Sequence, residues 1–441
     1  SSYTLVVNVA GPLGPGDKNV LMASIHCLLY VKNLSLRPKN RTYMKKLLVL
    51  LFICLNINAF SQNRMTLVEE DLPSVIERIM DRRDSVKNDG YKVRKITTHF
   101  NLEFAGSLNA YLTDGKFEEM SFKMNRVRLE FYGRLHDKLS YHFRQSFNKN
   151  SNPYSLDNMS SSIEYANIKW HTGERFDLVI GKQYLAVAGY EGYVNGLKVR
   201  EFCEFNNNFE IYQTGIKGVV KVSPDHHISV QVTNNRNSSD DNVYLYGLPD
   251  GIEPTKVPLL GTVLWNGLFA DKTVHLMYSA SAGQLAKGKN VYHFMCGNVY
   301  EKGPVLAYLD VLYSRSGIDY QQRVTSAMNR GVTVENTQHL TFVANVDYQF
   351  HPKWNAYLKG AYETASVYAD NGIFSKGRYI TSWNGQACVE WFPITQDKGF
   401  KVFAHYVYKG HSLSEKAKTL GAAMPHTQRV SLGIQYIIPV L

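Results

Sequence analysis

The sequence predicts an all-β protein: a transmembrane antiparallel β-barrel of about sixteen strands, with a short helix near the N-terminus. Three observations predict it. Apolar and polar residues alternate over long stretches from residue 96 onward, the connections between these stretches vary in a regular short and long order, and an export signal precedes them. Successive side chains of a strand point to opposite faces. Because lipid cannot hydrogen-bond free backbone groups, a membrane-spanning sheet has to close on itself.

The export signal occupies residues 44–61. Met44-Lys45-Lys46 form a positive start, 47–57 is an apolar stretch interrupted by Asn56, and Ala59 and Ser61 are candidate small residues at a cleavage site. This organisation is typical of a signal peptide, and the apolar stretch is too short to cross a bilayer as a helix. We interpret residues 1–43 as a non-native leader and expect the natural start at Met44.

Residues 62–95 are predicted to form an N-terminal periplasmic helical segment. Apolar residues at near-helical spacing, with charged residues between them, extend over 66–87, and Asn88-Asp89-Gly90 is a natural stop. The segment is interpreted as a plug, tail or oligomerisation element, or as a partly ordered linker. It is too short for the plug domain of an energy-coupled transporter.

The barrel is predicted over residues 96–441. In its first strand, Phe100, Leu102 and Phe104 share one face, while Asn101 and Glu103 share the other. The alternation continues over about 17 residues, far beyond the usual soluble strand of about five or six, and is long enough to cross a bilayer at a tilt. The predicted strands begin near residues 96, 120, 138, 161, 175, 209, 226, 260, 272, 290, 304, 338, 353, 380, 398 and 427.

The connections between these strands alternate in length. Short ones are predicted at 136–138, 172–174, 223–225, 270–272, 301–303, 351–352 and 393–397, and longer ones near 113–119, 148–160, 185–208, 235–259, 282–289, 316–337, 366–379 and 411–426. Short periplasmic turns on one rim and long external loops on the other give this order in outer-membrane barrels. An even number of strands also returns both ends of the barrel to the same side.

One face of the second strand carries Arg126, Arg128, Glu130 and Arg134. An Arg facing lipid near the bilayer midplane costs about 2–4 kcal/mol. We therefore predict that these four residues line a water-filled lumen, where basic side chains would attract anions or pair with acidic neighbours.

Four short motifs follow one another along the predicted barrel: Arg126-Val127-Arg128-Leu129-Glu130-Phe131-Tyr132-Gly133, Leu139-Ser140-Tyr141-His142-Phe143-Arg144, Ile180-Gly181-Lys182-Gln183 and Gln213-Thr214-Gly215-Ile216. Together they resemble the phosphate-selective porin family (the O/P type) in its Bacteroidetes form, over about residues 96–441. The resemblance implies a sixteen-stranded porin, commonly a homotrimer, that passes small anions or solutes. It adds Arg144 to the expected pore lining. Acidic residues such as Glu103 reduce the positive charge of that lining.

The segment 184–208 is the candidate for a loop folded into the pore. It is long and rich in glycine at its start, and it carries Lys198, Arg200, Glu201 and Glu204, whose mixed charges would set a field across a constriction. An ordinary external loop is the alternative interpretation.

The last strand contains a candidate assembly signal. Gly433, Tyr436 and Ile438 resemble the C-terminal pattern that the outer-membrane assembly machinery reads, although Pro439-Val440-Leu441 follow it. The expected partners are therefore outer-membrane lipid, this machinery, small anions or solutes, and further copies of the chain.

Charge and motifs exclude several other functions. The net charge of +11 falls to about +5 beyond residue 61, so nucleic-acid binding is not predicted. His226 and His227 are neighbours on a strand and point to opposite faces, so no metal site is expected, and Cys203, Cys296 and Cys388 form no CxxC pair. No catalytic grouping or phosphate-binding loop is present, so we predict no enzyme activity and no cofactor.

Three functions fit the predicted barrel. The first is an outer-membrane porin for passive diffusion of small ions or solutes, with anion or phosphate selectivity as one form. The second is a surface-exposed barrel whose external loops bind a host, phage or polymer partner. The third is a substrate-specific channel for sugars or fatty acids, which would need an aromatic track along the lumen. Single-channel conductance separates the first two.

Overall fold

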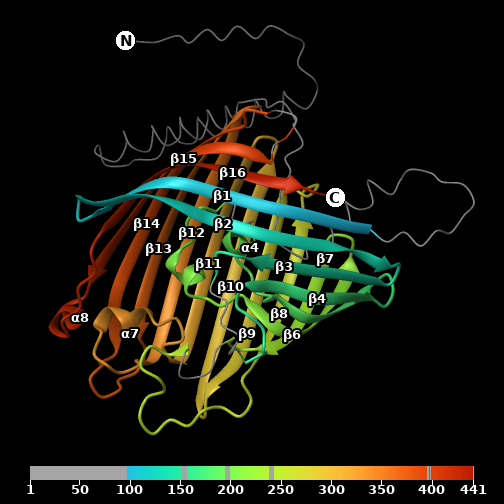
Figure 1. The fold of residues 1–441 in the computed structure, drawn as a ribbon. Coiled ribbons are helices and arrows are strands. Elements are labelled where there is room, and N and C mark those ends of the chain that lie inside the picture. Colours follow the sequence, from blue (N-terminus) through green and yellow to red (C-terminus); the bar gives the residue numbers. More distant parts are fainter. Residues whose placement is uncertain are drawn as a thin grey trace, which may run out of the picture. The chain divides into compact units, whose positions relative to one another are not determined.

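The computed structural model describes residues 97–149, 156–193, 199–237, 243–394, 397 and 399–440. The predicted leader, signal peptide and helix at 66–87 lie outside the described residues. In the described part, sixteen antiparallel strands close into one barrel in which every strand pairs with its sequence neighbours and β1 pairs with β16 (Figure 1).

The strands are β1 (Thr97–Thr113), β2 (Lys116–His136), β3 (Leu139–Ser146), β4 (Ile163–His171), β5 (Phe176–Tyr184), β6 (Tyr212–Ser223), β7 (His226–Asn234), β8 (Leu259–Phe269), β9 (Val274–Ala286), β10 (Lys289–Lys302), β11 (Val305–Ile318), β12 (Glu335–His351), β13 (Trp354–Val367), β14 (Gly377–Trp391), β15 (Phe400–Leu413) and β16 (Thr427–Pro439). Short helices lie in the connections: α4 (Tyr190–Tyr193), α5 (Glu204–Asn207), α7 (Arg323–Met328) and α8 (Glu415–Thr419). The predicted barrel of about sixteen strands is confirmed, and each strand begins within four residues of its predicted start.

Two of the connections predicted to be long, near 113–119 and 282–289, are wrong. Both are tight hairpins, with Asp114-Gly115 joining β1 to β2 and Lys287-Gly288 joining β9 to β10. Gly115 and Gly288 have φ angles of 78° and 74°, which glycine adopts without a steric penalty. An Asp-Gly pair between alternating residues favours a two-residue hairpin. The polar residues that flank the two hairpins belong to the strands β1, β2, β9 and β10. Because they are polar, the sequence predicted loops there.

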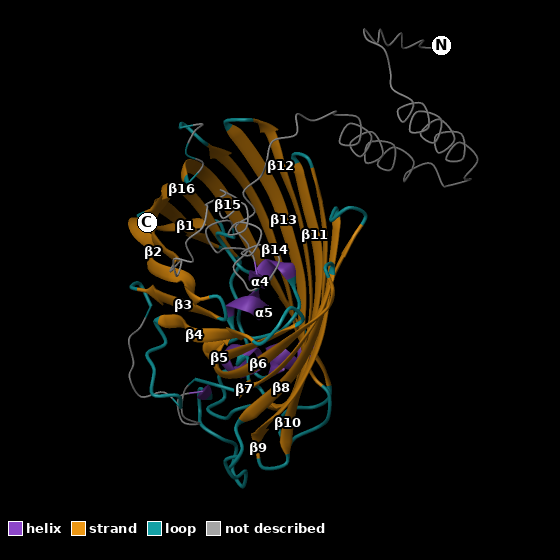
Figure 2. Cartoon of the chain, turned by 90° about the vertical axis from the view of Figure 1, so that its right-hand side faces the viewer, coloured by secondary structure: helices purple, strands orange, loops and turns teal. Residues whose placement is uncertain are grey.

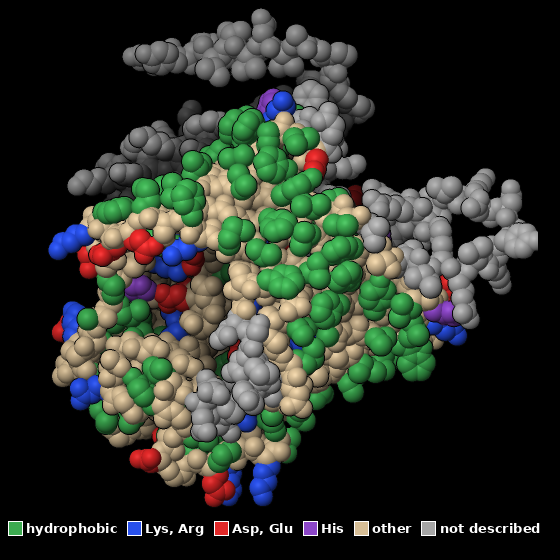
Figure 3. All heavy atoms as spheres, viewed as in Figure 1, with side chains coloured by type: hydrophobic (Ala, Val, Ile, Leu, Met, Phe, Trp, Pro, Cys, Tyr) green, Lys and Arg blue, Asp and Glu red, His purple; other side chains and the backbone are tan. Residues whose placement is uncertain are grey.

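The two faces of the strands differ as the alternation predicts. On β13, Leu358 and Tyr362 point outward and are 67% and 45% exposed, whereas the inward Lys359 and Glu363 are 5% and 1% exposed. Figure 3 shows apolar side chains over the outer face of the strands, and acidic and basic side chains inside a hollow below β1 and β2. No helix among the described residues is long and apolar enough to cross a membrane.

The main apolar core lies inside the barrel. It forms between the β5–β6 connection, residues 185–211, and inward side chains of the wall, such as Leu264, Met295, Leu312 and Val343. Figure 2 shows α4 and α5, both part of this connection, lying among the strands. We call the described residues of this connection, 185–193 and 199–211, the inner segment.

Candidate functional site

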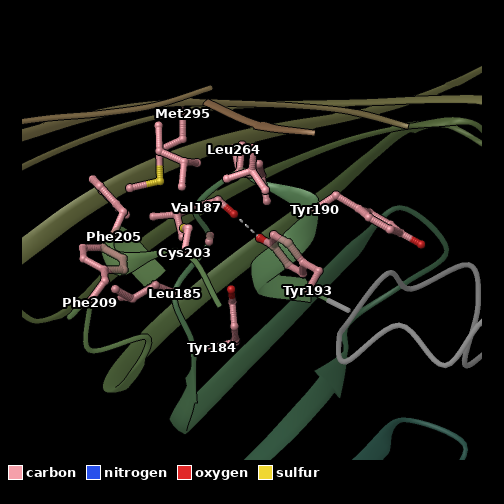
Figure 4. Packing of buried hydrophobic residues seen from close by; sticks show 14 of the residues in the cluster. Tyr184, Leu185, Val187, Tyr190, Tyr193, Cys203, Phe205, Phe209, Leu264 and Met295 are labelled. Carbon is pink, nitrogen blue, oxygen red and sulfur yellow. Dashed lines mark hydrogen bonds between the residues drawn. The ribbon is translucent and has the colours of Figure 1, made fainter. Parts of the chain in front are cut away.

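The inner segment crosses the barrel interior against the wall. Its apolar side chains, among them Leu185 and Val187, belong to one buried cluster with Leu264 of β8 and Met295 of β10 (Figure 4). The hydroxyl of Tyr193 donates to the Val187 carbonyl and closes the first turn of the segment. The segment that the sequence proposed as an inward loop therefore has an apolar contact surface for the wall as well as charged residues.

Wall side chains hold the backbone of the inner segment. The Ala186 N–H donates to Gln231 on β7 at 2.7 Å, and the Ala188 N–H donates to Ser279 on β9 at 2.7 Å. Further along, two carboxylates of the wall each accept two backbone N–H groups: Asp310 from residues 190 and 191, and Glu363 from residues 204 and 205. Hydrogen bonds of backbone donors to carboxylates are stronger than those between neutral groups.

The structure places three of the four predicted charged residues of this segment against wall partners, while Lys198 lies outside the described residues. Arg200 donates to Glu390 of β14 at 2.5 Å, to Gln435 of β16 at 3.1 Å, and packs over the ring of Phe403. Arg200 is therefore part of the attachment of the segment to the wall.

Glu201 and Glu204 pair with cations of the wall and of α7. Glu201 contacts Lys409 of β15 and lies 2.9 Å from Arg429 of β16, and Glu204 pairs with Arg323 of α7. Burial opposes ionisation of Glu201, but the charges of Lys409 and Arg429 outweigh it and hold its pKa below the ordinary range. Ionised Glu201 therefore stabilises the folded chain at neutral pH, and this contribution is lost only as the pH falls through the lowered pKa.

Arg128 and Arg144, predicted as pore-lining, face the barrel interior and meet at one carboxylate. The Arg144 Nε donates to Glu164 Oε2 at 2.7 Å, and the Arg128 Nε lies 3.4 Å from the same oxygen. Lys149 Nζ lies 2.6 Å from the other oxygen of Glu164, and Arg128 also lies 3.3 Å from Glu103. Both arginines are at most 3% exposed. Their charges are thus largely matched inside the wall.

Arg126, Glu130 and Arg134 share this inward face but remain partly exposed. Arg126 lies opposite the inward Ala105, and Glu130 is 15% exposed and lies 2.8 Å from His142 Nε2. Inward side chains that still reach solvent require a water-filled space beside the β1–β3 wall. Arg429 and Lys409, 24% and 26% exposed, border the same interior from β16 and β15.

Rings also contact one another along β3–β6, but these rings do not form an accessible track. His142 stacks on Tyr165 with ring centroids 4.2 Å apart, and Tyr212 contacts both Tyr165 and Tyr184. Tyr165 and Tyr184 are at most 1% exposed. Rings buried against one another offer no face to a sugar or an acyl chain, so the structure does not favour the third function.

The residues of the candidate assembly signal all lie on β16. Tyr436 contacts Phe400 of β15 edge to face, at 5.6 Å between ring centroids, and Ile438 pairs with Leu102. Gly433 lies where a Cβ would come 2.5 Å from the Gly106 carbonyl oxygen, so only glycine fits. Among the described residues, no group of three or more His, Cys, Asp or Glu could hold a metal ion.

Sequence reasoning missed the acceptors that organise this interior: Glu164, Glu191, Asp310, Glu363 and Glu390. The alternation of the strands does place Asp310, Glu363 and Glu390 on inward faces, which was the available signal. The partners of these three carboxylates in the inner segment lie more than one hundred residues away along the chain, so no local pattern could identify those contacts.

Comparison with known proteins agrees with this architecture. A family model described as "Phosphate-selective porin O and P" matches residues 100–438. The outer membrane channel DcaP of Acinetobacter baumannii is similar with a TM-score of 0.56 and 11% identity, over 79% of this chain and 99% of that chain. The anion-selective porin from Comamonas acidovorans is similar with a TM-score of 0.49 and 8% identity, over 78% of this chain and 100% of that chain.

No curated protein sequence matches the chain. At 11% identity, the similarity to the DcaP structure supports the fold alone. The family model, in contrast, covers almost the whole barrel, from β1 to β16. This chain therefore belongs to the phosphate-selective porin O and P family and is an outer-membrane porin.

Proposed function

We propose that the chain is exported by its signal peptide, assembles in the outer membrane as a homotrimer, and passes small solutes with a preference for anions. The observation that carries the proposal is the asymmetry of the barrel interior. The inner segment is attached to β7, β9, β11 and β13–β16, while the β1–β3 wall keeps partly exposed charged side chains that face inward.

Anion preference follows from which of these charges reach the water-filled interior. Arg128 and Arg144 are paired with buried carboxylates, so their fields largely cancel. Arg126 and Arg134 are more exposed and lie on the same inward face. Charged side chains lining a pore set the sign of the ions it favours.

We expect the double variant Arg126→Gln/Arg134→Gln to lose most of its anion preference, because two basic side chains leave the lumen face. The measurement is the reversal potential in a salt gradient across a planar bilayer. The control variant Lys287→Gln/Lys418→Gln removes two cations that are 70% and 57% exposed in the connections between strands, and it should keep the wild-type value. Equal shifts in both double variants would contradict a selective role for the β2 arginines. A wild-type barrel that never conducts would overturn the porin function.

The trimer is supported by a free strand edge. β3 pairs with β2 only from Arg128 onward, so among the described residues no strand covers the far edge of residues 116–126. This stretch exposes Phe117, Met120, Phe122 and Met124 by 57–83%, and Phe122 lies opposite Leu108 in the apolar band of β1. An unpaired edge is not tolerated in lipid, so we propose that another copy covers it.

We expect Phe122→Asp to convert trimers into monomers, because it places a charge in the covered surface. Light scattering of the detergent-purified barrel gives the mass. Leu358→Asp is the control, since Leu358 is 67% exposed on the distant outer face of β13. A wild-type protein that is monomeric would end the trimer proposal, as would a Phe122→Asp protein that remains a trimer.

A further inference from the structure

The middle of the inner segment is tied together by one buried carboxylate. Glu191 is fully buried in α4, and its oxygens accept the Cys203 N–H at 3.2 Å and the Asn206 side-chain amide at 2.6 Å. Residue 191 belongs to the first half of the segment in the sequence, and residues 203 and 206 belong to the second half. Glu191 therefore joins the two halves of the segment on either side of residues 194–198.

One lysine of the wall reaches the same place. Lys359, on the inward face of β13 and 5% exposed, donates its Nζ to Glu191 and to the carbonyl oxygen of Glu201. Gln386 of β14 donates to the same carbonyl at 3.0 Å. Lys359 thus binds both halves of the segment at once, and it is the buried cation that lies in contact with the Glu191 carboxylate.

The carboxylates described above lie on the same side. Asp310 on β11 accepts the backbone N–H groups of residues 190 and 191 in α4. Glu363 on β13 accepts the backbone N–H groups of residues 204 and 205 in α5. All three wall side chains are at least 95% buried. The inner segment is therefore attached to β11 and β13 by a compact set of hydrogen bonds to ionisable side chains. Among the described residues, Lys359 is the one cation that bonds to Glu191.

We infer that Lys359 is a positioning residue that fixes how far the inner segment projects into the lumen, and so fixes the width of the conducting path. The inference rests on the proposed function as a channel. Without the ammonium group, Glu191 would be a buried carboxylate without a compensating charge, an unfavourable state that burial makes worse. If the segment moves away from β13, water reaches Glu191 and hydrates the carboxylate, which removes this unfavourable state. The described helices of the segment, α4 and α5, would then leave their fixed position against β13.

The test compares Lys359→Met with Lys359→Arg and with the control Lys221→Met. Lys221 is also an inward wall lysine, but it pairs with Asp177 at 3.3 Å on the neighbouring strand β5. We expect Lys359→Met to broaden the distribution of single-channel conductances at least twofold and to add current noise. Lys359→Arg should restore a narrow distribution, and Lys221→Met should resemble the wild type. The same narrow distribution in Lys359→Met, from barrels shown to be folded by gel mobility, would overturn the inference.

A second measurement does not depend on conduction. Cys203 is fully buried between the two halves of the segment, and its thiol can be followed with a water-soluble maleimide after the other cysteines are replaced by alanine. We expect labelling at least ten times faster in Lys359→Met than in the parent and in Lys221→Met. Equal labelling rates would refute the positioning role even if the wild-type barrel conducts. Fast labelling in a barrel that does not conduct would support the attachment while refuting the channel function.

Discussion

Replacing Gly181 with alanine should prevent most of the protein from reaching the folded barrel. Gly181 has a φ angle of 120°, which residues with a side chain rarely adopt, and a Cβ at this position would lie 2.3 Å from the carbonyl oxygen of Ala166. It pairs across β5 and β6 with Gly215, where a Cβ would lie 2.2 Å from the Val232 carbonyl oxygen. Both obstacles are backbone atoms of neighbouring strands, so the collision cannot be relieved by turning a side chain.

The expected loss of stability is at least about 3 kcal/mol for Gly181→Ala, since overpacking and a strained backbone each cost of the order of 1–3 kcal/mol. Gly215→Ala should be somewhat milder because its φ angle is ordinary. The measurement is urea unfolding of the purified barrel in detergent, with heat-dependent gel mobility to report the folded fraction. Gly385→Ala is the matched control: it is also a strand glycine, on β14, and nothing lies within 4 Å of its added Cβ. Equal losses at positions 181 and 385 would show that the close approach of β5 to β4 at Gly181 does not limit stability.

The second large effect is expected from removing residues 189–208, with a short Gly-Ser linker in their place. This part of the inner segment occupies the barrel interior and carries its charged attachments. Because a constriction governs flow through a pore, the deletion should raise single-channel conductance by about twofold or more. It should also raise the anion preference, because it removes Glu201 and leaves its cation partners, Lys409 and Arg429, on the wall.

Planar-bilayer recordings measure both quantities on one preparation. The control replaces residues 329–332, four exposed residues of the β11–β12 connection, with Gly-Ser, and it should leave conductance unchanged. The interior groups left by the deletion, including Asp310 and Glu363, would face water, so the barrel is expected to fold with reduced stability. If a folded deletion variant keeps wild-type conductance, the inner segment is not the constriction.

The strands were predictable because each strand carries its own signal. Alternating residues such as Leu358 and Lys359 must lie on opposite faces, and in a membrane protein the polar face has to turn away from lipid. This local rule located all sixteen strands, and the long, charged connection at 184–208 was a candidate for an inward loop, with an external loop as the alternative. It misjudged the connections at Asp114-Gly115 and Lys287-Gly288, since polar strand ends and polar loops look alike in sequence.

The sequence by itself therefore determined the closed two-faced wall, the inward direction of Arg128, Arg144 and their neighbours, and the presence of a segment with mixed charges. Only the tertiary structure decided which charges cancel: Arg128 and Arg144 meet at Glu164, and Lys359 meets Glu191 from a strand 168 residues further along the chain. Side-chain direction follows from the period of the chain, but the pairing of buried charges depends on how distant strands approach one another, and no local period encodes that distance.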